Sequence, residues 1–128
     1  MFKVIALVFV GGAIGAIARE LLMLGVPDLH DGFPMPIFVA NIVAAFLLGL
    51  VTGMHDRGAV NDPVNTMVAT GIMGGLSTFS SFIYGSYVLM NESTTAAAVA
   101  ILYLLISLVV GYVALCAGLK IGGHRGAV

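Results

Sequence analysis

Charged residues divide the chain into four long uncharged stretches. The charges fall at position 3, within 19–31, within 55–62, at 92 and within 120–125. The uncharged stretches between them are 4–18, 32–54, 63–91 and 93–119. A membrane-spanning helix needs about 20 mainly apolar residues, and each stretch supplies or approaches that length. The pattern predicts an all-α membrane protein with four transmembrane helices in a single domain, residues 1–128.

Composition supports the membrane class. Of the 128 residues, 60% are hydrophobic and 9% are charged, which is too little charge to cover a water-soluble domain. The net charge of −1 and the lack of a Lys/Arg run exclude a nucleic-acid partner, which requires a basic surface. Cys116 is the single cysteine, so no intrachain disulfide forms, and no His/Cys cluster indicates a zinc site. No nucleophile and base stand at catalytic spacing, so we expect no enzyme.

The first predicted helix spans residues 2–23 and admits a second interpretation. Lys3, an apolar run and the small residues Ala16 and Ala18 also fit a secretory signal peptide with its cleavage site. Small residues nevertheless recur throughout 11–16, at spacings that let helices approach closely in lipid. Helix packing therefore explains them better than cleavage.

The third stretch is too long for one straight span. The second helix is predicted to end near Met54, and after a polar hairpin Asp62 caps and Pro63 starts the third. The 29 uncharged residues that follow would form a rod of roughly 43 Å, against a hydrocarbon core of roughly 30 Å. Gly74-Gly75, followed by the helix-starting residues Ser77-Thr78, predicts a break between half-helices 63–73 and 79–90. The fourth helix is predicted to start after Ser93 and to end near Lys120.

A break at membrane depth offers partners to ions of both signs. The end of the first half-helix presents bare carbonyls to a cation, and the start of the second presents bare amides to an anion. Such breaks persist only where protein, ions or water satisfy the freed groups. Phe79 and Phe82 follow on one helical face, where positively polarised ring edges would favour an anion, although both also fit a packed core or a lipid-facing position.

Several other polar residues are candidates for an anion path. Asn41 lies within the second span, where its amide serves either as an anion donor or as a hydrogen-bonding link between helices. Tyr103 and Ser107 share a face of the fourth helix with Gly111, where their hydroxyls either donate hydrogen bonds to an anion or tie helices together. Ser80 and Ser81 either extend this stripe or bond to the local backbone at the helix start.

Charged and titratable groups play a smaller part in this interpretation. Arg19 either extends its charge to the membrane surface or attracts anions at a pore mouth, next to Glu20. His30, His55 and His124 fall in loops or the tail and receive no role. Because four thin helices leave little room for a conduit, a second subunit is expected.

Three segments carry a resemblance to a known family. Residues 74–82 (GGLSTFSSF), together with residues 12–19 (GAIGAIAR) and with Asn41 between them, resemble the Fluc (CrcB-type) fluoride channels. The likeness covers the whole chain in length, number of spans and motif order. It implies passive export of fluoride across a bacterial inner membrane by an antiparallel homodimer with two pores.

The resemblance also assigns roles to individual residues. Phe79 and Phe82 look like the paired aromatics of the pore, with Asn41 as the amide nearby. The remaining matches are Tyr103, Ser107 and Ser81 as pore hydroxyls, Arg19 as the vestibule arginine, and Gly74 and Ser77 as residues whose backbone carbonyls hold a structural sodium ion. Positions 111 and 114 are Gly and Ala, so the hydroxyl stripe is expected to be shorter than in some relatives.

Charge distribution complicates the antiparallel arrangement. Four spans place both termini on one side together with the 55–62 hairpin, so four of the five Lys and Arg residues share that side and oppose Arg19. The positive-inside rule favours a single orientation with cytoplasmic termini, whereas an antiparallel dimer requires both orientations.

Two other functions remain open at this point. A small proton-coupled multidrug exporter would need a membrane carboxylate as a proton relay, and Glu20 is its sole candidate. A non-transporting structural membrane protein would use its Gly, Ser and Thr residues for helix packing alone.

Overall fold

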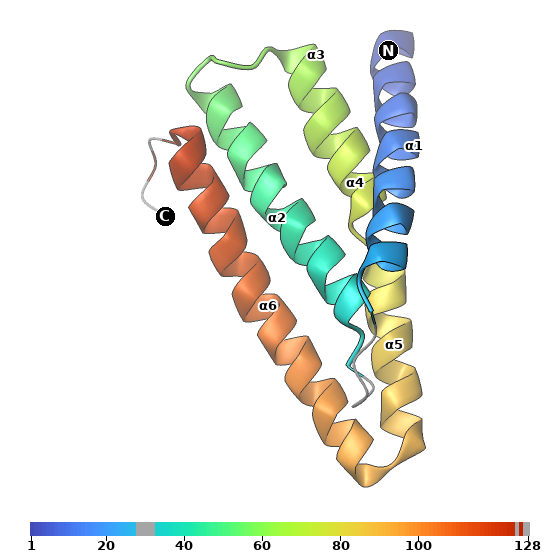
Figure 1. Ribbon diagram of the computed structural model, residues 1–128. Helices are drawn as coiled ribbons and strands as arrows, with labels where there is room; N and C mark the ends of the chain where they lie inside the picture. Colours follow the sequence, from blue (N-terminus) through green and yellow to red (C-terminus); the bar gives the residue numbers. More distant parts are fainter. Residues whose placement is uncertain (28–32, 125, 127–128) are drawn as a thin grey trace.

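The computed structural model describes residues 1–27, 33–124 and 126, and every regular element in that part of the chain is helical. In chain order the elements are α1 (Phe2–Gly25), α2 (Met35–Asp56), α3 (Asp62–Asn65), the π-helical segment η1 (Thr66–Ile72), α4 (Met73–Leu76), α5 (Phe79–Glu92) and α6 (Thr94–Gly122). Figure 1 shows their arrangement.

Four helical stretches are long and apolar enough to cross a bilayer, as the charge pattern predicts. They are Phe2–Gly25, Met35–Asp56, Asp62–Glu92 and Thr94–Gly122. The N-terminus, the turn from α2 to α3 and the end of α6 lie toward the same end of the molecule (Figure 1), as an even number of spans requires. The four-span prediction is confirmed.

Helices α2 and α6 form the most extensive pair in the fold, and glycines line their contact. Gly49 and Gly53 of α2 face Gly118 and Gly122 of α6, each pair spaced four residues apart. A Cβ on Gly118 would overlap the Phe46 carbonyl, and one on Gly53 would lie 3.0 Å from the Gly122 Cα. Since apolar side chains gain little by leaving lipid, close backbone approach between small residues is what holds such a pair together. We call this contact the α2–α6 glycine seam.

A second contact of the same kind joins α1 to η1 and α4. Gly11 and Gly15 of α1 face Gly71 and Gly75, and a Cβ on Gly71 would lie 2.9 Å from the Gly11 Cα. The prediction that the small residues of the first helix serve close packing is therefore confirmed for Gly11 and Gly15, which are buried.

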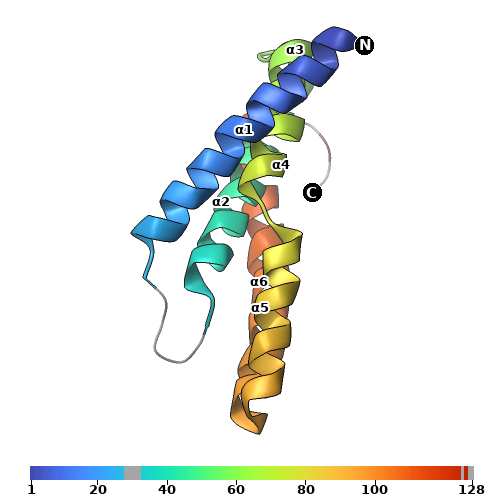
Figure 2. The ribbon, with the colours of Figure 1, turned by 90° about the vertical axis from the view of Figure 1, so that its right-hand side faces the viewer.

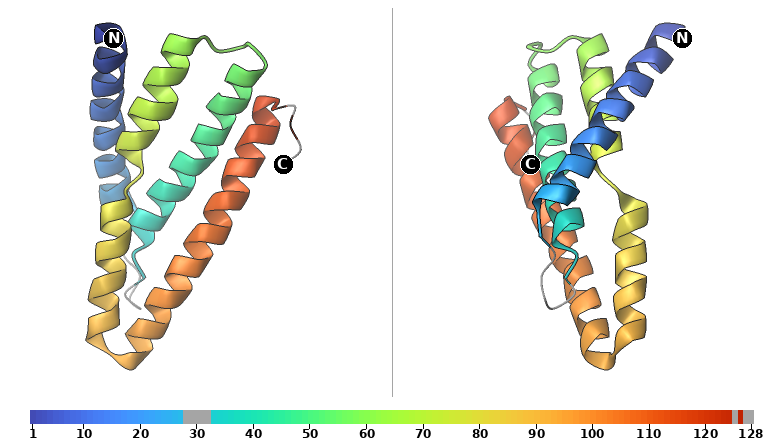
Figure 3. Two further views of the ribbon diagram at one scale, coloured as in Figure 1. Left: turned by 180° about the vertical axis from the view of Figure 1, so that it is seen from behind. Right: turned by 45° about the vertical axis from the view of Figure 1, so that its right-hand side comes forward.

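The third span changes partner where it breaks. Its first part, through η1 and α4, packs against α1, whereas α5 packs against α6. Figure 2 and Figure 3 show the chain leaving α1 at the end of α4 and continuing as α5 alongside α6. The break thus redirects the span from one neighbour to another as well as shortening it.

The position of the break corrects the sequence-based prediction. Gly74 and Gly75 are both helical, and α4 continues to Leu76 rather than ending at residue 73. The chain is extended at Ser77 (φ −74°, ψ 152°) and Thr78 (φ −144°, ψ 108°) instead. Gly75 serves the packing against α1, because its Cβ would overlap the Gly12 carbonyl. The prediction that the helix breaks at the glycine pair is therefore wrong. The predicted start of α5 at Phe79 is confirmed.

Two further details differ from prediction. The N-cap of α3 is Asn61, whose side chain accepts a hydrogen bond from the Val64 amide at 3.1 Å, so the prediction of Asp62 as the cap is wrong by one residue. The π-helical turn of η1 was not foreseen; the Met73 amide bonds to the Val68 carbonyl, five residues back.

The histidines also need a correction where they are described. His55 and His124 are half-buried rather than solvated: His55 Nδ1 lies 2.9 Å from the Val60 carbonyl, and His124 contacts Asp56. The second contact ties the end of α2 to the residues just after α6. His30 lies outside the described residues.

Candidate functional site

The two-residue break is closed on each side by a local hydrogen bond. The Ser77 amide donates to the Met73 carbonyl at 2.9 Å and completes α4. The Thr78 hydroxyl caps α5 by accepting from the Ser81 amide at 3.2 Å. Both extended residues are held by hydrogen bonds, and Thr78 is only 5% exposed.

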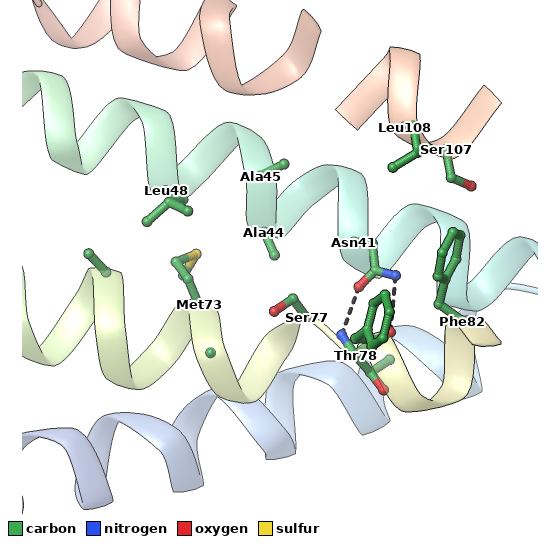
Figure 4. Close-up of a pocket in the computed structure, with 13 residues that line it drawn as sticks. Asn41, Ala44, Ala45, Leu48, Met73, Ser77, Thr78, Phe82, Ser107 and Leu108 are labelled. Atoms are coloured by element: carbon green, nitrogen blue, oxygen red, sulfur yellow. Dashed lines mark hydrogen bonds between the residues drawn. The ribbon is translucent and has the colours of Figure 1, made fainter. Parts of the chain in front are cut away.

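Asn41 holds the break from the neighbouring helix. Its Oδ1 accepts from the Thr78 amide at 2.7 Å, and its Nδ2 donates to the Thr78 carbonyl at 3.3 Å. The dashed lines in Figure 4 mark these two bonds between α2 and the start of α5. The side chain thus replaces the backbone partners that the break removes, which lipid cannot supply.

A cavity of about 420 Å³ lies beside the hydrogen-bonded pair Asn41 and Thr78. Residues of α2, of the third span and of α6 line it, and none of the thirteen lining residues is charged. Figure 4 shows Asn41, Phe82 and Ser107 gathered toward one end of it. Six of the residues singled out from the sequence line this cavity: Asn41, Gly74, Ser77, Phe79, Phe82 and Ser107.

The two phenylalanines are neighbours but face different surroundings. Their ring centroids lie 6.1 Å apart with 38° between the ring planes, which confirms that they share one side of α5. Phe82 is 9% exposed and packs on Tyr103, with ring centroids 5.2 Å apart. Phe79 also lines the cavity but is 76% exposed.

Two hydroxyls near the cavity have no hydrogen-bond partner among the described residues. Tyr103 is completely buried between the rings of Phe33 and Phe82, yet its hydroxyl is unbonded. The buried Ser107 hydroxyl, one helical turn further along α6, is unbonded as well. Most buried polar groups in proteins are paired, so two adjacent unpaired hydroxyls indicate donors available to a ligand. The stripe ends at Ser107, since Gly111 and Ala114 carry no hydroxyl.

The remaining predicted site residues lie elsewhere. Ser81 lines a separate cavity of about 380 Å³ together with Ser80 and Tyr84. Arg19 and Glu20, on α1, line neither cavity, and among the described residues no ion pair joins them. Glu20 is exposed, so it is not placed as a buried proton relay.

Sequence reasoning missed the central position of Thr78. Its hydroxyl caps α5 and also donates to the Ser81 hydroxyl at 3.0 Å, while its backbone holds Asn41. A threonine just before a helix start is a visible capping signal. Its pairing with Asn41, 37 residues away, has no local sequence signal.

These features define a class of protein: a four-span helical membrane protein with an uncharged polar site at a break in its third span. The family model described as "CrcB-like protein, Camphor Resistance (CrcB)" matches residues 6–119, and the chain belongs to this family.

Several relatives carry the same functional name. The chain is 58% identical over 122 residues to a Yersinia pseudotuberculosis protein named "Fluoride-specific ion channel FluC 3", covering 95% of this chain and 90% of the relative. It is 53% identical to "Fluoride-specific ion channel FluC 2" of Brucella melitensis, covering 95% of this chain but 45% of that longer protein. A 37% identical relative in Ignicoccus hospitalis, "Fluoride-specific ion channel FluC", is matched over 91% of this chain and 92% of its own.

Proposed function

We propose that this chain forms a fluoride-selective channel that lets fluoride leave the cell passively. The observation that carries the proposal is the uncharged cavity at the break, where Asn41, Phe79, Phe82 and Ser107 meet. The names of the relatives, up to 58% identical, support the same ion.

The chemistry of the cavity suits a small, strongly hydrated anion. A fluoride pore has to replace water with hydrogen-bond donors while avoiding a fixed cation that would trap the ion. Asn41 and Ser107 supply donors that line the cavity, and the edges of Phe79 and Phe82 supply positive polarisation there. The Tyr103 hydroxyl, buried against Phe82 and without a partner among the described residues, supplies a further donor beside the cavity. Ser81 extends the donors along α5, and Arg19 raises the anion concentration at a pore mouth without binding tightly.

The working channel in this proposal is an antiparallel homodimer with two pores in the bacterial inner membrane. The single chain supports a partner in two ways: Phe79 is 76% exposed, and the exposed Gly74 has no atom within 4 Å of where a Cβ would stand. Both lie at the open side of the cavity, which a second copy would cover. The Lys and Arg distribution opposes dual insertion, so this part rests on the family likeness.

A structural sodium ion completes the proposed assembly. The C-terminal end of α4 carries negative partial charge and presents carbonyl oxygens, the donor type that hard cations prefer. The described residues contain no cluster of three His, Cys, Asp or Glu side chains that would hold a metal instead. The carbonyls of Gly74 and Ser77 would hold the ion, and the chemistry it supplies is positive charge at the dimer centre.

Fluoride efflux from reconstituted vesicles tests the function. Purified protein in liposomes loaded with potassium fluoride should release fluoride once valinomycin balances the charge, and should release chloride far more slowly. Folded, helical protein that releases no more fluoride than empty liposomes would refute the channel and leave a structural role.

A further inference from the structure

The carbonyls of Gly74 and Ser77 are free because their usual donors bond elsewhere. In an unbroken helix the Thr78 amide would donate to the Gly74 carbonyl, and the Ser81 amide to the Ser77 carbonyl. The Thr78 amide instead donates to Asn41 Oδ1 at 2.7 Å. The Ser81 amide instead donates to the Thr78 hydroxyl at 3.2 Å. Among the described residues, neither carbonyl accepts any hydrogen bond.

We propose that Asn41 and Thr78 are positioning residues for the cation, because their side chains capture the two amides that would otherwise occupy these carbonyls. This inference rests on the proposed sodium site and explains why its two oxygens remain available. Among the described residues, the carbonyls of residues 74–78 accept no hydrogen bond from a backbone amide. The two whose helical donors are captured by side-chain acceptors are those of Gly74 and Ser77, the residues that the family likeness assigns to sodium.

The hydrogen bonds that hold these two amides are expected to be stable inside the membrane. Asn41 makes two bonds to the backbone of Thr78, so its side chain is fixed in one orientation. Thr78 is 5% exposed, and hydrogen bonds are strong where water does not compete. If either side-chain acceptor is removed, its amide must stay unsatisfied or return to its helical acceptor, the Gly74 carbonyl for Thr78 and the Ser77 carbonyl for Ser81. The second outcome would extend the helix across the break and withdraw a cation ligand.

Asn41 thereby connects the two proposed ion sites. It lines the cavity that contains Phe82 and Ser107, and it also holds the backbone next to Ser77. Loss of fluoride flux in an Asn41 variant cannot distinguish these roles, since either one would stop conduction. A readout that depends on the cation alone is needed.

Sodium-dependent thermal stability of the full-length purified protein provides that readout. The melting temperature is measured in detergent as NaCl replaces choline chloride at constant ionic strength, for the parent, Asn41→Ala, Thr78→Val and Thr78→Ser. The parent and Thr78→Ser, which keeps the hydroxyl, should be stabilised by sodium to a plateau. For Asn41→Ala and Thr78→Val the sodium concentration that gives half the effect should rise about tenfold or more.

A matched control separates this effect from loss of an amide in general. Asn91→Ala removes a side chain whose amide bonds to the Tyr87 carbonyl of its own helix at 2.7 Å, on an exposed face. Its sodium response should equal that of the parent. If Asn41→Ala does not fold, the comparison of Thr78→Val with Thr78→Ser carries the test.

The possible outcomes separate failure of this inference from failure of the proposed fluoride-channel function. A parent protein that sodium does not stabilise would overturn the sodium site and this inference together, whereas fluoride efflux would still stand. A parent that responds to sodium, with Asn41→Ala and Thr78→Val responding equally well, would overturn only the positioning role. Asn41 would then be an anion-path amide alone.

Discussion

The α2–α6 glycine seam and the break in the third span are both places where the backbone lies close to other groups, but opposite residue types build them. At the seam, Gly49 and Gly118 bring two helices together by carrying no side chain. At the break, Asn41 and Thr78 supply side chains that substitute for missing backbone partners. The seam therefore depends on excluded volume, and the break depends on individual hydrogen bonds.

This difference predicts how each region responds to change. A seam fails when any atom is added, because the obstacle is a backbone carbonyl that cannot move aside. The break tolerates a change of shape when the acceptor is kept and fails when it is lost. The same span shows both behaviours, since Gly75 packs against α1 only two residues before the extended Ser77.

The largest expected effect is from a methyl group added to the seam. Gly118→Ala would place its Cβ against the Phe46 carbonyl and 2.7 Å from the Leu50 amide nitrogen. We expect the free energy of unfolding to fall by about 1–3 kcal/mol or more, the range for overpacked cores. Little properly folded protein should therefore be recovered. Yield of monodisperse protein on size exclusion and the thermal unfolding midpoint measure it.

Gly111→Ala is the matched control on the same helix. Its Cβ would meet only the Ile42 Cδ1, at 3.7 Å, which is an ordinary contact. This variant should fold like the parent, with a small gain from better helix propensity. Equal behaviour of Gly118→Ala and Gly111→Ala would show that the seam is not close-packed in the membrane.

The next effect in size concerns conduction without loss of fold. Phe82→Ile and Phe79→Ile remove the ring edges from the cavity while keeping apolar volume. Each should lower fluoride efflux from liposomes by about tenfold or more, because loss of about 1.4 kcal/mol of ion stabilisation gives that factor. Helix content and elution volume should stay unchanged.

The two variants should differ in stability. Phe82 is 9% exposed and packs on Tyr103, so Phe82→Ile should lower the melting temperature more than Phe79→Ile does. Parental efflux rates in both variants would contradict the proposed role of the aromatic edges.

The sequence predicts the spans well and the break less accurately, for physical reasons. Span number follows from the spacing of charges, because charge is costly anywhere in the bilayer. The break was correctly expected within residues 63–91, since an uninterrupted rod exceeds the membrane. Its position was misassigned to Gly74-Gly75, because glycine marks both helix rupture and close packing, and only the partner helix distinguishes them.

The residues of the candidate site were predictable from the sequence, but the hydrogen bonds between its helices were not. Asn41, Phe79, Phe82 and Ser107 were singled out from residue type and spacing, and they line one cavity. The bonds from Asn41 to Thr78 depend on how α2 lies against the third span, which no periodicity encodes. The interhelical link and the pore amide, posed as alternatives for Asn41, are compatible in one side chain.

The smallest expected effect sharpens the comparison most, because it contrasts unpartnered hydroxyls with partnered ones. Ser107→Ala and Tyr103→Phe each remove a buried hydroxyl that has no hydrogen-bond partner in the described part of the chain. Removing such a group relieves its desolvation cost, so stability should stay level or rise by up to about 1 kcal/mol. Fluoride efflux should nevertheless fall a few-fold, since each variant loses one donor to the ion.

Thr78→Val provides the opposite case, since its hydroxyl accepts from the Ser81 amide and donates to the Ser81 hydroxyl. Its loss should cost about 1 kcal/mol or more of stability as well as conduction. Melting temperature and efflux, measured on the same preparations, separate the two kinds of hydroxyl.

If Ser107→Ala and Tyr103→Phe instead destabilise the protein and leave efflux unchanged, the stripe on α6 links helices and does not line an ion path. If the variants keep their stability but conduct less fluoride, the hydroxyls of Tyr103 and Ser107 act on the ion, because a purely structural role would not lower efflux alone.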